Sequence, residues 1–261
     1  MQIPTFSTSN DPGPDFAGLL RSQGLNPAVP DGPVSAAGAI PHGTTVVAVR
    51  YADGVVMAGD RRATSGNFIS HRSIEKVFPA DRWSGVAIAG AAGPAMEMVK
   101  LFQLQLEHYE KVEGQALSLE GKANQLSQMV RNHLPAAMQG LAVVPLFAGY
   151  DVRRGIGRLF QYDVTGGRYE ENDYATSGSG GLHAATVVKL GFGEDLDRGA
   201  TLDLALKALV TAADEDSATG GPDPARGIWP VVATIDVDGF TRVPDEELAE
   251  RFAALTEGGG R

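Results

Sequence analysis

The stretch His42-Gly43-Thr44-Thr45-Val46 lies where the composition of this chain changes. The residues before Thr44 show little sign of a hydrophobic core, whereas the residues after it predict buried β-structure at once. Cleavage of the Gly43–Thr44 bond would make this threonine a new N-terminus. The hydroxyl of an N-terminal threonine is a nucleophile, and its own α-amine can accept the proton. The competing interpretation is that Thr44 and Thr45 only start a strand, because threonine favours strands.

The segment before this junction differs from the rest of the chain. Residues 1–43 contain prolines throughout but only one Lys or Arg, Arg21. This composition is typical of a flexible extension, in which residues 15–20 have the pattern for one or two helical turns. Composition alone favours a disordered tail, and the alternative is a removable propeptide that ends at Gly43.

Composition also limits the classes of function. The formal net charge of −10 argues against nucleic acid or an anionic membrane as the main partner. The chain has no cysteine, so disulfides, thiolate metal sites and a cysteine nucleophile are excluded. No apolar run reaches the roughly 18 residues that span a bilayer, and no secretory signal is present. We therefore expect a cytoplasmic protein, and the scattered histidines give no reason to expect a metal or cofactor.

After Thr44 the sequence predicts strands that are buried on both faces. Segments 45–49 and 55–60 are almost continuously apolar, without alternation, and Asp53-Gly54 between them is a strong hairpin signal. Further strands are predicted at 74–78, 86–90, 143–150, 159–163 and 231–235, the last with a hairpin turn at Asp238-Gly239. The second half repeats the order of strand and then helix, with residues 174–176 leading into the next helix.

Helical patterns separate the two groups of strands. Apolar residues recur at helical spacing from Ala95 to Tyr109, and Ser118 is a candidate N-cap for a second helix. Such a pair, joined by a short loop, can lie antiparallel across one face of a sheet. Later helices are predicted at 181–190, 202–212 and 248–255. Two buried sheets and two helix groups predict an α/β fold with four layers in the order α/β/β/α.

Six sequence features, each weak alone, occur together in this chain. They are Gly43-Thr44-Thr45-Val46-Val47, Gly59-Asp60-Arg61-Arg62-Ala63-Thr64, Lys76, Gly90, Gly178-Ser179-Gly180 and Asp216-Ser217-Ala218-Thr219-Gly220-Gly221. In this order and spacing they resemble the β subunits of the 20S proteasome, above all the actinobacterial form with its long propeptide. The resemblance extends from Gly43 to about residue 250.

The resemblance implies a fold, a domain division and a mechanism. The fold would be the four-layer sandwich of N-terminal-nucleophile hydrolases, with residues 1–43 as a propeptide removed autocatalytically and 44–261 as a threonine protease domain. Thr44 would be the catalytic nucleophile, and Lys76 would lower the pKa values of its amine and hydroxyl. Asp60 would pair with Lys76, and the backbone N–H of Gly90 would be the oxyanion donor. Taken singly, Lys76 also fits a lysine at a strand edge, and Asp60 and Gly90 also fit ordinary turn positions.

Three further residues match the family's groups around the threonine amine: Ser179, Asp216 and Thr219. Family members commonly have serine where this chain has Thr219, so the hydroxyl is retained but a methyl group is added. The simpler interpretations are a helix cap for Ser179 and a solvated acidic run for residues 214–216.

The resemblance also implies a substrate pocket and an assembly. Residues Ala63, Thr64, Ile88, Ala92 and Met96 would bind substrate, with preference for a hydrophobic residue before the cleaved bond. Two β rings would lie between two α rings, each of seven subunits, and small-protein-tagged or unfolded proteins would be the substrates. The chain has no nucleotide-binding loop, so a separate ATPase ring would supply the energy for unfolding.

Three alternatives remain open from the sequence. A non-catalytic ring subunit would be expected to lose the Gly-Thr junction or the lysine. Another N-terminal-threonine amidohydrolase would share the chemistry but need not share the Asp-Arg-Arg-Ala-Thr context after the second strand. A simpler bacterial threonine protease, built of β-type rings alone, would have a shorter chain without the long extension and the C-terminal helix.

Overall fold

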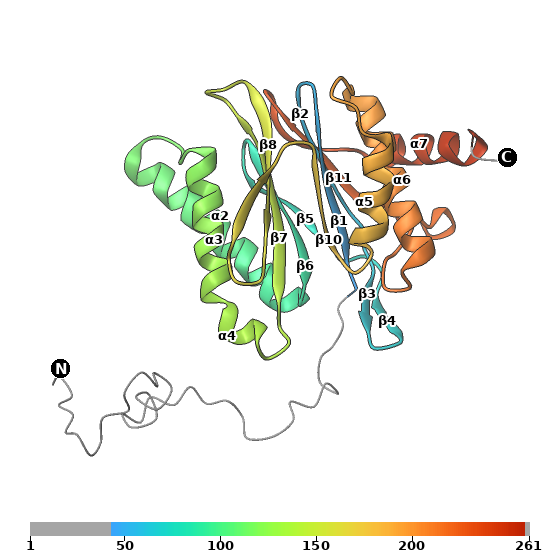
Figure 1. Cartoon of the computed structure of the whole chain (residues 1–261), viewed down its shortest axis with the longest axis horizontal. Coiled ribbons are helices and arrows are strands. Elements are labelled where there is room, and N and C mark those ends of the chain that lie inside the picture. The colour runs from blue at the N-terminus through green and yellow to red at the C-terminus, as the bar shows by residue number, and fades with distance from the viewer. Residues whose placement is uncertain (1–42, 259–261) are drawn as a thin grey trace, which may run out of the picture. The chain divides into compact units, whose positions relative to one another are not determined.

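A computed structural model describes residues 43–258 of the chain (Figure 1). Nearly all of the expected extension, including the helical pattern at 15–20, lies outside the described residues, as does the tail at 259–261. The described part contains two five-stranded antiparallel sheets and one small two-stranded sheet.

The first sheet contains the start of the described chain as an inner strand, next to the edge strand β10. Its strand order is β10-β1-β2-β11-β12, and Thr45 lies opposite Gly178 in the register between β1 and β10. Every residue of β2 is buried, as the absence of alternation in the sequence predicts. The strands are β1 (Thr45–Tyr51), β2 (Gly54–Gly59), β10 (Tyr174–Gly178), β11 (Val231–Asp236) and β12 (Gly239–Arg242).

The second sheet has the order β5-β6-β7-β8-β9, so its strands are neighbours in the order in which they follow along the chain, although the helices at 92–137 lie between β6 and β7. Phe147 and Phe160 face each other on β7 and β8, with ring centroids 6.0 Å apart. The strands are β5 (Val77–Asp81), β6 (Ser84–Gly90), β7 (Val143–Asp151), β8 (Ile156–Tyr162) and β9 (Arg168–Glu171).

Helices cover the outer faces of both sheets, and Figure 1 shows α2 and α3 on one side with α5 and α6 on the other. Buried apolar residues form three separate clusters. One lies between the helices and the first sheet, one between the two sheets, and one between the helices and the second sheet. The predicted α/β/β/α order is therefore confirmed. The helices are α2 (Ala92–Glu113), α3 (Leu119–Asn132), α4 (Leu134–Ala137), α5 (Gly181–Gly191), α6 (Arg198–Glu215), the 3₁₀ turn η2 (Pro224–Arg226) and α7 (Asp245–Gly258).

The predicted helix pair forms with one difference in its apolar stripe. The Ser118 side chain accepts a hydrogen bond from Gly121 N–H at 3.1 Å and so caps α3. Val99 and Phe102 on α2 are buried, but Tyr109, one turn beyond the end of the buried stripe, is exposed. Periodicity alone therefore overestimated the buried face of this helix.

One predicted strand was misplaced, and three short strands were missed. The strand expected at 74–78 begins at Val77 and extends to Asp81. The carbonyl oxygen of Lys76 still accepts from Ile88 N–H at 2.8 Å, while the Lys76 side chain donates to Asp60. The missed strands are β9 and the hairpin of β3 (Ala63–Ser65) and β4 (Phe68–His71). All residues of β4 are exposed, so no burial pattern marked it in the sequence. In the part of the chain that the structure describes, no helix is long and apolar enough to cross a membrane.

Candidate active site

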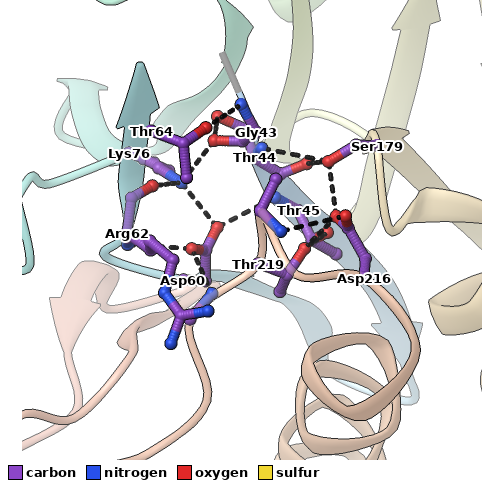
Figure 2. A network of polar contacts seen from close by, with 12 residues as sticks. Gly43, Thr44, Thr45, Asp60, Arg62, Thr64, Lys76, Ser179, Asp216 and Thr219 are labelled. Carbon is purple, nitrogen blue, oxygen red and sulfur yellow. Dashed lines mark hydrogen bonds and ion pairs between the residues drawn. The ribbon is translucent and has the colours of Figure 1, made fainter. Parts of the chain in front are cut away.

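The candidate site lies where β1 begins, and it gathers segments that are far apart in the sequence (Figure 2). Thr44 directly precedes β1 and is only 4% exposed. Gly178 at the end of β10 has φ of +98°, and a Cβ atom there would lie 1.8 Å from the Thr44 carbonyl oxygen. Only glycine adopts this backbone and leaves this space, so Gly178 allows β10 to approach Thr44 closely.

A buried carboxylate fixes one side of the site. Oδ1 of Asp60 accepts hydrogen bonds from Thr45 N–H at 2.8 Å and from Lys76 Nζ at 2.6 Å. Oδ2 accepts from the N–H groups of Arg62 and Gly220, both at 2.9 Å. A carboxylate offers about four acceptor positions, and all of them are used here. Asp60 therefore holds the start of β1, the lysine and two loops in one arrangement.

Lys76 lies next to this carboxylate and is 3% exposed. Besides Asp60, its Nζ donates to the carbonyl oxygen of Arg62 at 2.6 Å and to that of Gly43 at 3.4 Å. An ammonium group has three protons, and each one has an acceptor. Burial holds the pKa of Lys76 below its usual value, although the Asp60 carboxylate acts in the opposite direction.

A second polar group lies on the other side of Thr44. The Thr44 N–H donates to Ser179 Oγ at 3.3 Å, and Ser179 Oγ donates to Asp216 Oδ2 at 2.5 Å. The Thr219 hydroxyl donates to the same Asp216 oxygen at 2.6 Å. Burial raises the pKa of Asp216, but the hydroxyl hydrogen bonds from Ser179 and Thr219 hold it below its usual value.

The Gly43–Thr44 peptide bond is intact and lies between these groups. Its carbonyl oxygen accepts from the Thr44 hydroxyl at 2.7 Å, and the Gly43 N–H donates to Thr64 Oγ1 at 3.3 Å. A Cβ atom on Gly43 would lie 1.9 Å from the Cβ of Ala218. The site therefore admits glycine, but no larger residue without rearrangement, immediately before Thr44.

A small cavity of about 20 Å³ opens beside the threonine, with room for a single water molecule. Of the expected substrate-binding residues, Ala63, Ile88 and Ala92 line this cavity, as does Gly90. Met96 does not line it and packs instead with the cluster between the helices and the second sheet. Thr64 contacts Gly43 through its hydroxyl. In this uncleaved chain, the Gly43 carbonyl has no hydrogen bond from Gly90.

Sequence reasoning missed several residues of the site. Thr45 bonds through its backbone to Asp60, and its hydroxyl lies 2.6 Å from that of Thr219. Ile74 and Ala95 line the cavity. Thr45 could have been noticed as a polar residue at the start of a strand whose next four positions are apolar. Nothing in the sequence pattern distinguishes Ile74 and Ala95 from ordinary core residues.

The arrangement supplies the groups needed for acyl transfer. It holds a hydroxyl beside a carbonyl, a buried cation next to the carbonyl oxygen, and a second set of polar groups at the nitrogen of the same peptide bond. Among the described residues, no group of three or more His, Asp or Glu side chains is placed to hold a metal ion.

The four-layer fold defines the class of N-terminal-nucleophile hydrolases. Within that class the chain belongs to the proteasome subunit family, since residues 40–223 match the family model described as proteasome subunit. It is 60% identical to the proteasome subunit beta of Acidimicrobium ferrooxidans over 98% of this chain and 94% of that protein. It is 59% identical to the proteasome subunit beta of Streptomyces griseus over 86% of this chain and 80% of that protein. Members of this family are components of multi-subunit proteolytic particles.

The Asp60–Lys76 pair gives a first prediction. Asp60→Asn keeps the size of the side chain but leaves the buried Lys76 charge without its counter-ion, which is expected to lower the unfolding free energy by about 3–5 kcal/mol. Adding Lys76→Met should restore part of the loss because it removes the uncompensated charge. Chemical denaturation of the parent chain, Asp60→Asn and the double variant measures the three unfolding free energies. Equal stability of Asp60→Asn and the parent chain would contradict it.

The pKa of Asp216 gives a second prediction. Because its folded-state pKa is lowered, the carboxylate stabilises the fold fully above its unfolded pKa of about 4, and this contribution is lost as the pH falls below that value. The Asp216→Asn variant lacks this contribution. The difference in melting temperature between the parent chain and this variant should therefore become smaller as the pH is lowered from 6 to 3. A difference that stays constant over this range would show that Asp216 is not held ionised by its partners.

Proposed function

We propose that this chain is a catalytic β subunit of a 20S proteasome core particle, with Thr44 as the nucleophile of a threonine endopeptidase. One observation carries the proposal: the Thr44 hydroxyl lies 2.7 Å from the carbonyl oxygen of the bond that precedes it, beside a buried lysine. The family membership supports a protease in general, and this geometry supports the threonine mechanism.

The first reaction would be cleavage of the chain by itself. The Thr44 hydroxyl oxygen attacks the Gly43 carbonyl carbon, a new C–O bond forms, and the C–N bond of the peptide breaks. The hydroxyl proton ends on the released nitrogen, which becomes a primary amine. Water then hydrolyses the ester, which gives a Gly43 carboxylate and regenerates the hydroxyl. Lys76 Nζ, 3.4 Å from the carbonyl oxygen, would stabilise the negative charge that develops there.

The second reaction would be cleavage of peptide substrates. The free α-amine of Thr44 accepts the hydroxyl proton, directly or through water, and the hydroxyl oxygen forms an acyl-enzyme that water hydrolyses. An α-amine has an ordinary pKa near 8, and the positive charge of Lys76 lowers it further, so much of it is neutral at neutral pH. The uncleaved amide nitrogen cannot act as this base, so activity would await removal of residues 1–43.

The other site residues would support these steps. Asp60 holds Lys76 in place, and the Gly90 N–H would bind the oxyanion once a substrate replaces Gly43 at the cavity. Ser179, Asp216 and Thr219 would orient the Thr44 nitrogen. The assembly would combine this subunit with other β subunits and with α subunits in stacked rings in the cytoplasm. A separate ATPase ring would deliver unfolded or tagged proteins.

The mass of the chain tests the first reaction. After co-expression with its α partner, the parent chain is expected to begin at Thr44, and Thr44→Ala is expected to keep its first 43 residues. Gly43→Ala should slow the cleavage at least about tenfold, because the added Cβ atom would clash with Ala218. An increase of about 1.4 kcal/mol in the activation barrier is enough for a tenfold decrease in rate. Intact-mass spectrometry of assembled particles over time measures all three. If the parent chain keeps its extension when fully assembled, a structural ring subunit is the better description.

Fluorogenic peptides test the specificity. The apolar lining by Ala63, Ile88 and Ala92 and the nearby charge of Lys76 predict a kcat/KM at least about tenfold higher after a hydrophobic residue than after a basic one. Thr44→Ala particles give the background rate. Fastest turnover after a basic residue would contradict the assignment of this cavity.

A further inference from the structure

Thr45 contacts both sides of the candidate active site, and its side chain is completely buried. Its backbone N–H donates to Asp60 Oδ1 at 2.8 Å, which connects it to the lysine side. Its hydroxyl oxygen lies 2.6 Å from that of Thr219, which connects it to the Asp216 side (Figure 2). The residue that follows the nucleophile is thus bonded to both groups that flank the nucleophile.

The direction of the hydrogen bonds on the Asp216 side follows from the number of protons available. An ionised carboxylate only accepts, so the Thr219 hydroxyl must donate its single proton to Asp216 Oδ2. The bond between the two threonine hydroxyls therefore needs the proton of Thr45. Ser179 likewise donates to Asp216, and its oxygen is left to accept from the Thr44 nitrogen at 3.3 Å.

A glycine provides the space for the pair of hydroxyls. A Cβ atom on Gly180 would lie 2.4 Å from Thr45 Oγ1 and 2.8 Å from Thr219 Oγ1. Gly180 has φ of −85°, a backbone conformation open to other residues. The absence of a side chain there is therefore explained by the two hydroxyls and not by the backbone.

We propose that Thr45 is a positioning residue for the Thr44 nucleophile, which acts through a directed chain of hydroxyls. Thr45 donates to Thr219, Thr219 donates to Asp216, and Asp216 holds Ser179 so that its oxygen faces the Thr44 nitrogen. This role rests on the proposed function, because the Thr44 nitrogen becomes the base only after cleavage. Thr45 touches no reacting atom and does not line the cavity, so it should affect the rate of the chemical step and not the binding of substrate.

The test compares isosteric and conservative variants in fully assembled, processed particles. Thr45→Val removes the hydroxyl at constant shape and is expected to lower kcat about tenfold with KM unchanged. Thr45→Ser keeps the hydroxyl and should stay within about twofold of the parent. Thr201→Val is the matched control, since Thr201 is equally buried and its hydroxyl donates to Asp197 O at 2.8 Å in α6, away from the site. This control should leave kcat unchanged.

A double-mutant cycle separates positioning from a general loss of stability. Thr45→Val and Thr219→Val break the same hydrogen bond, so the double variant should lose no more kcat than Thr219→Val alone. If Thr45→Val does not assemble, Gly180→Ala serves in its place, because its Cβ would separate the two hydroxyls, and it should also lower kcat at unchanged KM.

Two results would overturn the inference: a kcat of Thr45→Val within twofold of the parent, or fully additive losses in the cycle. Failure of the proposed function itself gives a different result. In that case the parent chain and Thr44→Ala both keep residues 1–43, and neither turns over peptides. If the parent cleaves itself and turns over peptides while Thr45→Val equals it, only the role of Thr45 is wrong.

Discussion

The buried ion pair between Asp60 and Lys76 is the interaction on which the site depends. Burying two charges costs several kcal/mol each, and only close geometry with additional hydrogen bonds offsets that cost. The chain meets this condition by directing three backbone N–H groups, from Thr45, Arg62 and Gly220, at the carboxylate. Because these donors come from three separate segments, the same charge pair also joins the start of β1 to the loops around it.

The parts of this structure that the sequence predicted are those with a continuous apolar pattern. The buried strands β1 and β2 and the helix pair α2 and α3 follow from burial and spacing alone. The hairpin of β3 and β4 could not be predicted in this way, because β4 is exposed along its whole length. Lys76 was placed inside a strand because Val77 and Phe78 after it are apolar. The strand begins one residue later, and the lysine side chain bonds to groups 14 and 16 positions away.

The candidate site was predicted mainly by family resemblance and only partly by chemistry. A glycine before a threonine suggests an N-terminal nucleophile, but the pattern alone gives no reason to place Ser179 or Asp216 near it. These partners are 135 or more positions away from Thr44, so only the fold brings them together. Thr45 was missed because threonine is common at the start of a strand, so its position needed no functional explanation. Its hydroxyl contact with Thr219 can be seen only in the folded structure.

The long sequence separation of these contacts also determines when during folding the site exists. The bond between Thr45 and Thr219 spans 174 positions, so closing it requires nearly the whole domain. A chain still emerging from the ribosome, or one whose last third is unfolded, has the Gly43–Thr44 bond but none of the groups at its nitrogen. Under the proposed chemistry, such a chain would cleave itself more slowly than the completely folded chain. Completion of the fold would then control when each subunit acquires a reactive N-terminus.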